Sequence, residues 1–156
     1  MNDFERLLFK IKRFNVDSIL REVWTNPRVQ NFIIDLNTEG KPTSQLFEKG
    51  EDSLGITLGQ YAASTIQGTA QFEGKLEKGQ RIDHITLKDT GDFYNTWEII
   101  PFLLGFRMEA NPIKEDSNLF DDFGKDIVGL NEENIIILGE FIRPFFIAVA
   151  KKRLSQ

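Results

Sequence analysis

The sequence predicts an α+β domain, in which N-terminal helices precede a small antiparallel β-sheet and a long C-terminal helix follows it. Apolar residues recur at helical spacing near both ends of the chain. Alternation of apolar and polar residues is confined to the middle. The chain has 156 residues and 40% hydrophobic content, so residues 1–156 are expected to form one domain with an ordinary core.

The first third of the chain is expected to hold three helices. Residues 3–13 have acids in the first turn and bases in the last, and their apolar stripe consists of Phe4, Leu7, Leu8 and Ile11. A second, shorter helix has Asp17 as its expected cap and an apolar face made of Ile19, Leu20 and Val23. A third begins with Thr25 or Asn26 as its cap and Pro27 in the first helical position. Its apolar stripe consists of Val29, Phe32, Ile33 and Leu36.

Polar connections follow these helices. One more helical turn is expected around Leu46, ending at Gly50, and another at residues 119–123. Residues 51–80 are rich in Gly, Ser, Thr and Gln and poor in bulky apolar residues. We expect an extended loop there, either flexible or ordered by a partner, because loops of this length in compact domains are usually functional or mobile.

The sheet is expected to come from three short segments. "RIDHITL", residues 81–87, alternates in a strand-like way. "FRMEAN" is the clearest strand, with Phe106 and Met108 on one face and Arg107 on the other. "TWEIIPF" should pair with it in antiparallel fashion, with "LLG" near the turn. Pro101 belongs at an edge or a bulge, because it cannot donate a ladder hydrogen bond.

Residues 132–154 are expected to form the longest helix. Asn131 is its expected cap, and Leu130 is expected to pack on Ile135 as a hydrophobic staple. Pro144 is expected to kink it. Its core stripe consists of Ile135, Leu138, Ile142, Phe145 and Val149. Four more residues widen the apolar face, namely Ile136, Ile137, Phe141 and Phe146. This excess indicates a helix that packs on two sides, one of them a subunit interface.

The composition excludes several classes of function. The chain has no cysteine, which excludes disulfides, thiolate metal sites and cysteine nucleophiles. Its single histidine, His84, excludes a multi-histidine metal site within one chain, and we expect no metal or other cofactor. A net charge of −5 offers no evident basic face for binding nucleic acid. No apolar run approaches the roughly 18–20 residues that a membrane span requires.

Candidate catalytic groups lie around His84 and among the aspartates. Asp83 adjoins His84, but neighbours on a strand point to opposite faces, so the two are not expected to act together. Paired carboxylates could act in hydrolysis or hold a hard cation. The candidates are Asp89, Asp92, Asp116, Asp121, Asp122 and Asp126. We interpret these acids as solvated loop residues and assign no catalytic or metal-ligating residue.

The segment "LKDTGDFYNTW", residues 87–97, predicts a corner between two strands. Asp89 or Thr90 can cap a short turn, and Gly91 permits an unusual backbone angle. The apolar faces of the corner come from Phe93, Tyr94 and Trp97. Its polar side chains are therefore expected to satisfy backbone donors.

A series of short motifs occurs in a characteristic order. Asp89, Thr90 and Gly91 are followed by Phe93, and Thr96 precedes the strand "WEIIPF". The upstream motifs are Leu58-Gly59-Gln60-Tyr61 and Ser64-Thr65. The downstream motifs are the aromatic-Gly pair that ends at Gly124 and the triplet Arg143-Pro144-Phe145. In this order and spacing the chain resembles the phage virion-morphogenesis and tail-completion proteins, which include minor tail and head–tail connector proteins.

The resemblance implies a structural protein of the virion, assembled in the host bacterial cytoplasm as a ring near the head–tail junction or the tail end, without enzymatic activity. The implied partners are other copies of the chain and neighbouring virion proteins: the connector, the tail terminator or the tail tube. Candidate interface residues lie in the 51–80 loop and the C-terminal helix, namely Leu58, Tyr61, Ile136, Phe141 and Phe146.

Two alternatives belong to other classes. The first is a small hydrolase that uses His84 or an aspartate pair. Alanine substitution of His84 and Asp89 separates it from a scaffold, because only an enzyme loses turnover. The second is a bacterial binding module unrelated to virions, which flanking capsid, portal and tail genes would exclude.

Overall fold

A computed structural model describes residues 3–115 and 117–155. The side chains of Phe4 and Leu7, two members of the stripe predicted for the first helix, lie outside the described residues. The predicted α+β class is confirmed, with helices before and after a small antiparallel sheet and the longest helix at the C-terminal end. Among the described residues, no helix combines the length and apolarity that a membrane span requires.

The three predicted N-terminal helices are confirmed as α1 (Asp3–Arg13), α2 (Val16–Trp24) and α3 (Pro27–Asn37). Asn26 caps α3 by accepting a hydrogen bond from the backbone N–H of Arg28. The cap predicted for α2 was wrong, because Asn15 caps it by accepting from the N–H of Ser18. Asn15 has the extended backbone of a cap, whereas Asp17 already lies in the first turn.

The turn predicted near Leu46 is confirmed as η1 (Gln45–Lys49), which ends at Gly50 in the left-handed region. Residues 51–80 are mostly irregular, with isolated bridges of one residue pair each. One short helix within them, α4 (Ala63–Gln67), was not predicted. The segment is therefore a long loop whose internal contacts are local.

The predicted hairpin is confirmed. Strand β1 (Glu98–Phe102) pairs in antiparallel register with β2 (Gly105–Glu109), and Leu103 and Leu104 form the turn. Pro101 stands opposite Phe106 near the turn. In a sheet of two strands each strand is an edge, so the missing N–H of Pro101 is tolerated.

The strand predicted at residues 81–87 was wrong. The segment is irregular and pairs with neither strand of the sheet. Its backbone groups bind elsewhere, since the N–H of Ile85 donates to Gly59 O and that of Thr86 donates to the hydroxyl of Tyr61. Leu87 has a positive φ of 57°, which bends the chain at the end of the segment. The alternation of apolar and polar residues in this segment did not reveal that its backbone N–H groups bind Gly59 and Tyr61.

The remaining helices are α5 (Asp92–Asn95), α6 (Leu119–Phe123), η2 (Lys125–Ile127) and α7 (Glu132–Ser155). Asn131 caps α7 as predicted, by accepting from the N–H of Asn134. The staple was wrong, because Ile135 faces outward while Leu130 packs against the core that contains Leu138. Helix α7 continues through Pro144 and ends at Ser155.

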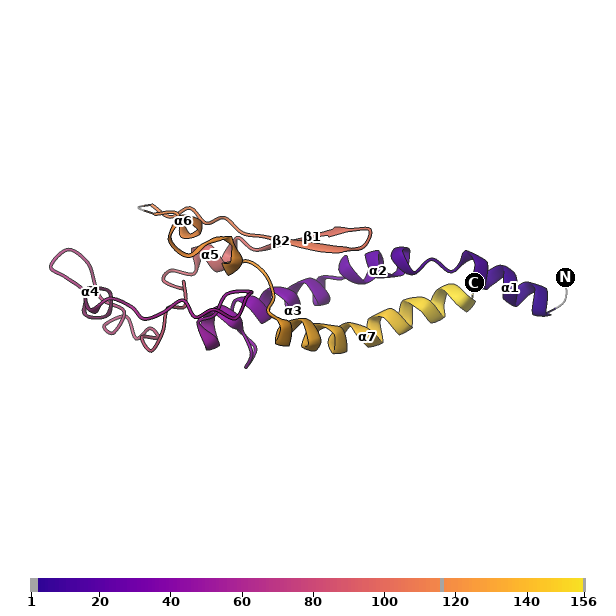
Figure 1. Cartoon of the computed structure of the whole chain (residues 1–156), viewed down its shortest axis with the longest axis horizontal. Helices are drawn as coiled ribbons and strands as arrows, with labels where there is room; N and C mark the ends of the chain where they lie inside the picture. The colour runs from indigo at the N-terminus through magenta and orange to yellow at the C-terminus, as the bar shows by residue number, and fades with distance from the viewer. Residues whose placement is uncertain (1–2, 116, 156) are drawn as a thin grey trace.

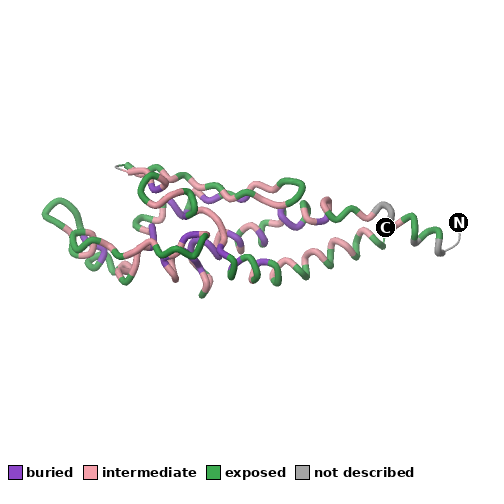
Figure 2. The backbone as a smooth tube through the Cα atoms, viewed as in Figure 1, coloured by how far each residue is buried: buried purple, intermediate pink, exposed green. Residues whose placement is uncertain are grey.

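The molecule is elongated, and α7 runs antiparallel beside α2 and α3 (Figure 1). The β1–β2 hairpin lies on the other side of these two helices. Buried residues gather in the middle of the molecule, whereas both ends are mostly exposed (Figure 2). Two apolar clusters form the core, one between α2, α3, α7 and β1 and one beneath the 87–97 corner. Ile34 and Met108 pack against both clusters and join them.

Buried carboxamides join the start of α7 to the end of α3 and to η1. The side-chain N–H groups of Asn134 donate to Leu36 O at 3.1 Å, to Thr43 O at 2.8 Å and to Gln45 Oε1 at 3.2 Å. Gln45 Oε1 also accepts from the N–H of Asn131 at 2.7 Å. Asn134 and Gln45 are fully buried, so these bonds are shielded from water. They fix where α7 begins.

Candidate functional site

The Thr90–Gly91 corner was the leading motif of the sequence, and its polar groups are held within the chain. Gly91 has a φ of 93° and immediately precedes α5. Thr90 Oγ1 donates to the carboxylate of Asp92 and accepts from the N–H of Asp92 at 3.4 Å. Asp89 accepts from Lys78 Nζ at 3.1 Å, and its backbone carbonyl accepts from Gln80 at 2.8 Å. The cap predicted at Asp89 or Thr90 was wrong, because Gly91 is the N-cap residue of α5 and no side chain caps the helix, while Thr90 closes a local turn with Asp92.

Electrostatics at Asp89 favour a charged carboxylate. Partial burial raises its pKa, but hydrogen bonds from Lys78 and Gln80 outweigh burial and lower the pKa below the ordinary value. The ion pair with Lys78 links the corner to the end of the 51–80 loop.

The apolar side of the corner is buried. Phe93, Tyr94 and Trp97 belong to the second core cluster, and the Phe93 and Trp97 rings meet edge to face at 5.6 Å. The hydroxyl of Tyr94 donates to Thr86 O, and burial raises the pKa of Tyr94 well above its usual range. Thr96 Oγ1 donates to Phe93 O and accepts from the N–H of Asn111. The motif thus anchors the hairpin to the core.

Two hollows flank the corner. One, of about 430 Å³, is lined by residues that include Asp89, Thr90, Asp92, Phe93 and Thr96. The other, of about 510 Å³, lies toward the 51–80 loop and shares Asp89 with the first. In the corner, Thr90 pairs with Asp92, and Thr96 pairs with the backbone of Phe93 and Asn111.

His84 is a connecting residue. Its Nε2 donates to Phe47 O at 2.9 Å, and its Nδ1 lies 3.1 Å from Asp83 Oδ2. The expectation that Asp83 points away from His84 was wrong, because the segment is not a strand. Both ring nitrogens are occupied, and the described contacts place no hydroxyl nucleophile on the ring. A hydrogen bond from Arg81 lowers the pKa of Asp83 to about 2.

Three of the candidate aspartates line the hollows beside the corner, Asp89 and Asp122 the larger one and Asp89 and Asp92 the smaller one. Among the described residues, no group of three His, Cys, Asp or Glu side chains is placed to hold a metal ion. Asp116 lies outside the described residues. Asp121 and Asp122 are exposed on α6. The described acids among the alternatives are all exposed, namely Asp89, Asp92, Asp121, Asp122 and Asp126.

The downstream motif residues have separate positions. Gly124, with a φ of 82°, joins α6 to η2. Arg143 and Pro144 are exposed on α7. Phe145 is half-buried beside Phe141, and the guanidinium of Arg28 lies 5.6 Å from its ring centre. Arg143, Pro144 and Phe145 therefore do not form a single site.

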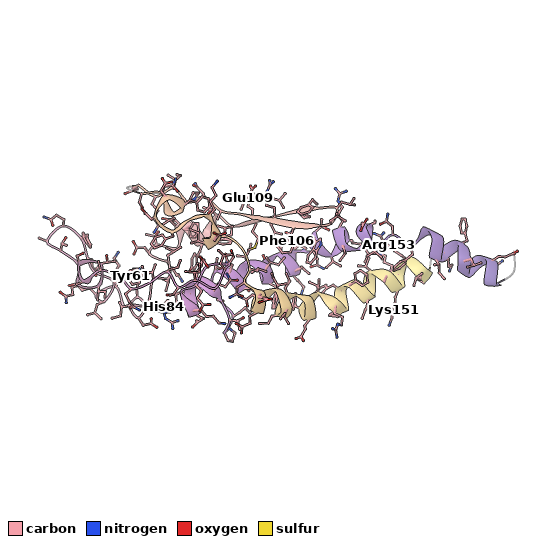
Figure 3. All side chains as sticks on the ribbon, viewed as in Figure 1. Tyr61, His84, Phe106, Glu109, Lys151 and Arg153 are labelled. Carbon is pink, nitrogen blue, oxygen red and sulfur yellow. The ribbon has the colours of Figure 1, made fainter. Side chains whose placement is uncertain are left out.

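Four of the five candidate interface residues contact their own chain. The hydroxyl of Tyr61 hydrogen-bonds to the side chain and the backbone N–H of Thr86, and Leu58 packs on the second cluster. Phe141 stacks on Phe32 at 3.7 Å, and Phe146 packs on the first cluster. Only Ile136 among these five candidates is classed as exposed. Figure 3 shows Tyr61 and His84 at the end of the molecule that carries the loop, away from Lys151 and Arg153.

Sequence reasoning missed one prominent apolar surface. The hairpin tip, defined as Phe102, Leu103 and Leu104, is exposed to 52%, 55% and 71%. The sequence did contain a signal for this surface: three consecutive apolar residues stand at a predicted turn, where polar residues are usual. Exposed apolar residues also occur in the loop, namely Leu54, Ile56, Phe72 and Leu76.

The chain exposes more surface than a compact protein of its size. Its accessible surface is 9888 Å². A compact monomer of 18.0 kDa is expected to expose about 8,000 Å². The excess is about what a subunit would bury in two standard interfaces, each of which covers roughly 800 Å² of one partner.

No known family model, curated protein or solved structure matches this chain. The function is therefore inferred from the motifs and geometry of the chain itself.

Proposed function

We propose that this protein is a structural component of a tailed-phage virion, of the tail-completion or neck type, that assembles as a ring. It contacts copies of itself and neighbouring virion proteins: the connector, the tail terminator or the tail tube. Assembly takes place in the host bacterial cytoplasm and the mature location is the virion. The role requires no cofactor, enzymatic activity, membrane insertion or sequence-specific nucleic-acid binding.

The observation that carries the proposal is the exposed apolar surface of an elongated chain. Large apolar side chains are exposed on α1, on the hairpin tip, in the 51–80 loop and on α7. Monomeric proteins rarely leave extensive apolar patches uncovered, because contact with water is unfavourable. Together with a surface area above that of a compact monomer, this distribution favours a subunit that is covered by others.

The ordered motifs support the virion as the place of assembly. Thr90, Gly91 and Phe93 form a corner that anchors the hairpin, so the resemblance rests on residues that maintain the fold. The hairpin tip that this anchor holds is apolar and exposed, which suits contact with a neighbouring protein. The net charge of −5 suits a passage through which DNA slides without binding.

The test is to purify the chain for native mass spectrometry and negative-stain imaging, and to search purified virions for its peptides. We expect its peptides in virions, and rings either alone or on a neighbouring ring protein. A strict monomer that is also absent from virions contradicts the proposal. A ring whose lumen is lined by basic side chains contradicts the DNA-passage role only.

A further inference from the structure

The first half of α7 has an exposed apolar patch that no described part of the chain covers. Ile135 and Ile136 are 56% and 63% exposed. Glu132 and Glu140 lie one helical turn before and after Ile136, and both are exposed. These four residues and Gly139 are called the α7 outer face.

Gly139 gives this face a notch. It is exposed inside a helix, and a Cβ at this position would meet no atom within 4 Å. Glycine in a helix interior costs about 0.5–1 kcal/mol relative to alanine. The described chain has no contact that needs its small size, but another backbone could approach closely here.

Helix α1 contributes no described side chain to the core of its own chain. Leu8 and Ile11, one turn apart, are 40% and 53% exposed. Isolated helices shorter than about 12–15 residues are marginal in water, so an 11-residue helix gains from a partner. Figure 1 shows α1 projecting at one end of the molecule.

The two surfaces have complementary charge. The sequence of α1, "DFERLLFKIKR", has four basic and two acidic residues. The segment "EENIIILGE" at the start of α7 has three glutamates and no basic residue; Glu133 pairs with Lys49 of its own chain, which leaves Glu132 and Glu140 beside the apolar residues. Opposite charges around apolar centres favour pairing in one orientation.

The two surfaces cannot meet within one copy. Lys10 Nζ donates to Leu154 O at 2.9 Å, which holds α1 at the C-terminal end of its own α7. Leu154 follows Ile136 by about five helical turns, or about 27 Å. A second copy is therefore needed to bring α1 to the α7 outer face.

We propose that Leu8 and Ile11 of α1 in one copy dock on the α7 outer face of a second copy. The inference rests on the self-assembly proposed above and names its contact. The two surfaces differ, so the interface is head-to-tail, and it closes into a ring when the rotation between copies permits.

The absence of cysteine makes crosslinking specific. The variants Ile11→Cys and Ile136→Cys are purified separately, mixed in equal amounts and oxidised, and the products are mapped by mass spectrometry. The expected main product is the mixed 11–136 disulfide, and the double variant should give species larger than a dimer. Leu104→Cys serves as a competitor at the hairpin tip.

Four outcomes overturn the docking contact. They are a predominant 11–11 product, a predominant 136–136 product, a predominant 104–136 product when Leu104→Cys replaces Ile11→Cys, and no mixed product at all. If rings form without the 11–136 product, the contact is wrong but the virion role stands. If the product forms in a chain that is absent from virions, the contact stands and the virion role fails.

A second variant excludes trivial loss of folding. Gly139→Leu raises helix propensity and fills the notch, so we expect unchanged or higher thermal stability together with loss of the 11–136 product. Ala148→Leu adds similar bulk at an exposed position later in α7 and should retain the product. Retention of the product in Gly139→Leu contradicts close approach at Gly139.

Discussion

The imidazole Nε2 of His84 lies 2.9 Å from the carbonyl oxygen of Phe47, 37 residues earlier in the chain. Gly50, at the end of η1, lies directly against the ring, since a Cβ on Gly50 would be 2.5 Å from His84 Cδ2. The single histidine thus joins the irregular 81–87 segment to η1.

Replacing His84 by alanine should lower the free energy of unfolding by about 1–2 kcal/mol, because the part-buried carbonyl of Phe47 loses one of its two donors, keeping only Arg81 Nη1, and the ring leaves a gap. Urea denaturation monitored by circular dichroism measures this. Gln60→Ala, at an exposed position, is the control and should change stability little. Equal effects of the two substitutions would contradict a connecting role for His84.

Gly50→Ala should destabilise more than Gly55→Ala. Both glycines have a positive φ, of 63° and 75°, so both substitutions incur backbone strain of about 1–2 kcal/mol. A Cβ at Gly55 meets open space, whereas one at Gly50 collides with the His84 ring. Thermal unfolding should show the difference, and adding His84→Ala to Gly50→Ala should give a loss smaller than the sum. Equal losses at the two glycines would exclude the collision.

Acid should weaken the Arg81–Asp83 contact. The folded pKa of Asp83 is about 2, below its unfolded value, because Arg81 donates to its carboxylate. This contribution to stability is therefore fully present above the unfolded pKa of about 3.9 and is lost as the pH falls through about 2. Urea midpoints measured from pH 7 to pH 2.5 should fall less steeply for Asp83→Asn than for the parent. Asp121→Asn removes the same charge at an exposed position of α6 and controls for net charge.

Asn134→Ala should cost about 2–4 kcal/mol of unfolding free energy, because Leu36 O and Thr43 O lose a buried donor and the side chain leaves a cavity. Chemical denaturation gives the value. Asn95→Ala, at an exposed position, is the matched control. A loss below about 0.5 kcal/mol, the usual range for surface substitutions, would show that the carboxamide bonds do not hold α7 in place.

Replacing Leu103 and Leu104 together by serine should leave thermal stability nearly unchanged, because both side chains are exposed in the isolated chain. Binding to a neighbouring virion protein, measured by co-purification from a virion assembly mixture, should weaken. Leu54→Ser, in the 51–80 loop, distinguishes the hairpin tip from the loop as the contact. Unchanged binding in the hairpin variant would remove the tip from the proposed interface.

Local signals made most of the helices and the hairpin predictable, whereas the short helix α4 was not predicted. Asn26 and Pro27 mark the start of α3 and Gly50 marks the end of η1, because capping and left-handed turns depend on a few adjacent residues. The 81–87 segment was mispredicted because its alternation satisfies the pattern of a strand. The partners of its backbone groups, such as the Tyr61 hydroxyl, come from distant parts of the chain.

The candidate interface was only partly predictable for the same reason. The sequence shows that α7 has more apolar residues than one packed face needs, but not which of them pack inside. Phe141 stacks on Phe32, while Ile136 is left exposed. The choice depends on the rotation of α7 against α2 and α3, which the buried bonds of Asn134 help to set.

The sequence by itself determined the α+β class, most element boundaries and the Thr90–Gly91 corner, because these depend on spacing, capping and turn residues within a few positions. Only the tertiary structure decided that His84 binds the carbonyl of Phe47, that Leu8 and Ile11 of α1 are exposed and that Ile135 and Ile136 face outward. Those outcomes arise from contacts between residues far apart in the chain, and such contacts depend on how the helices pack.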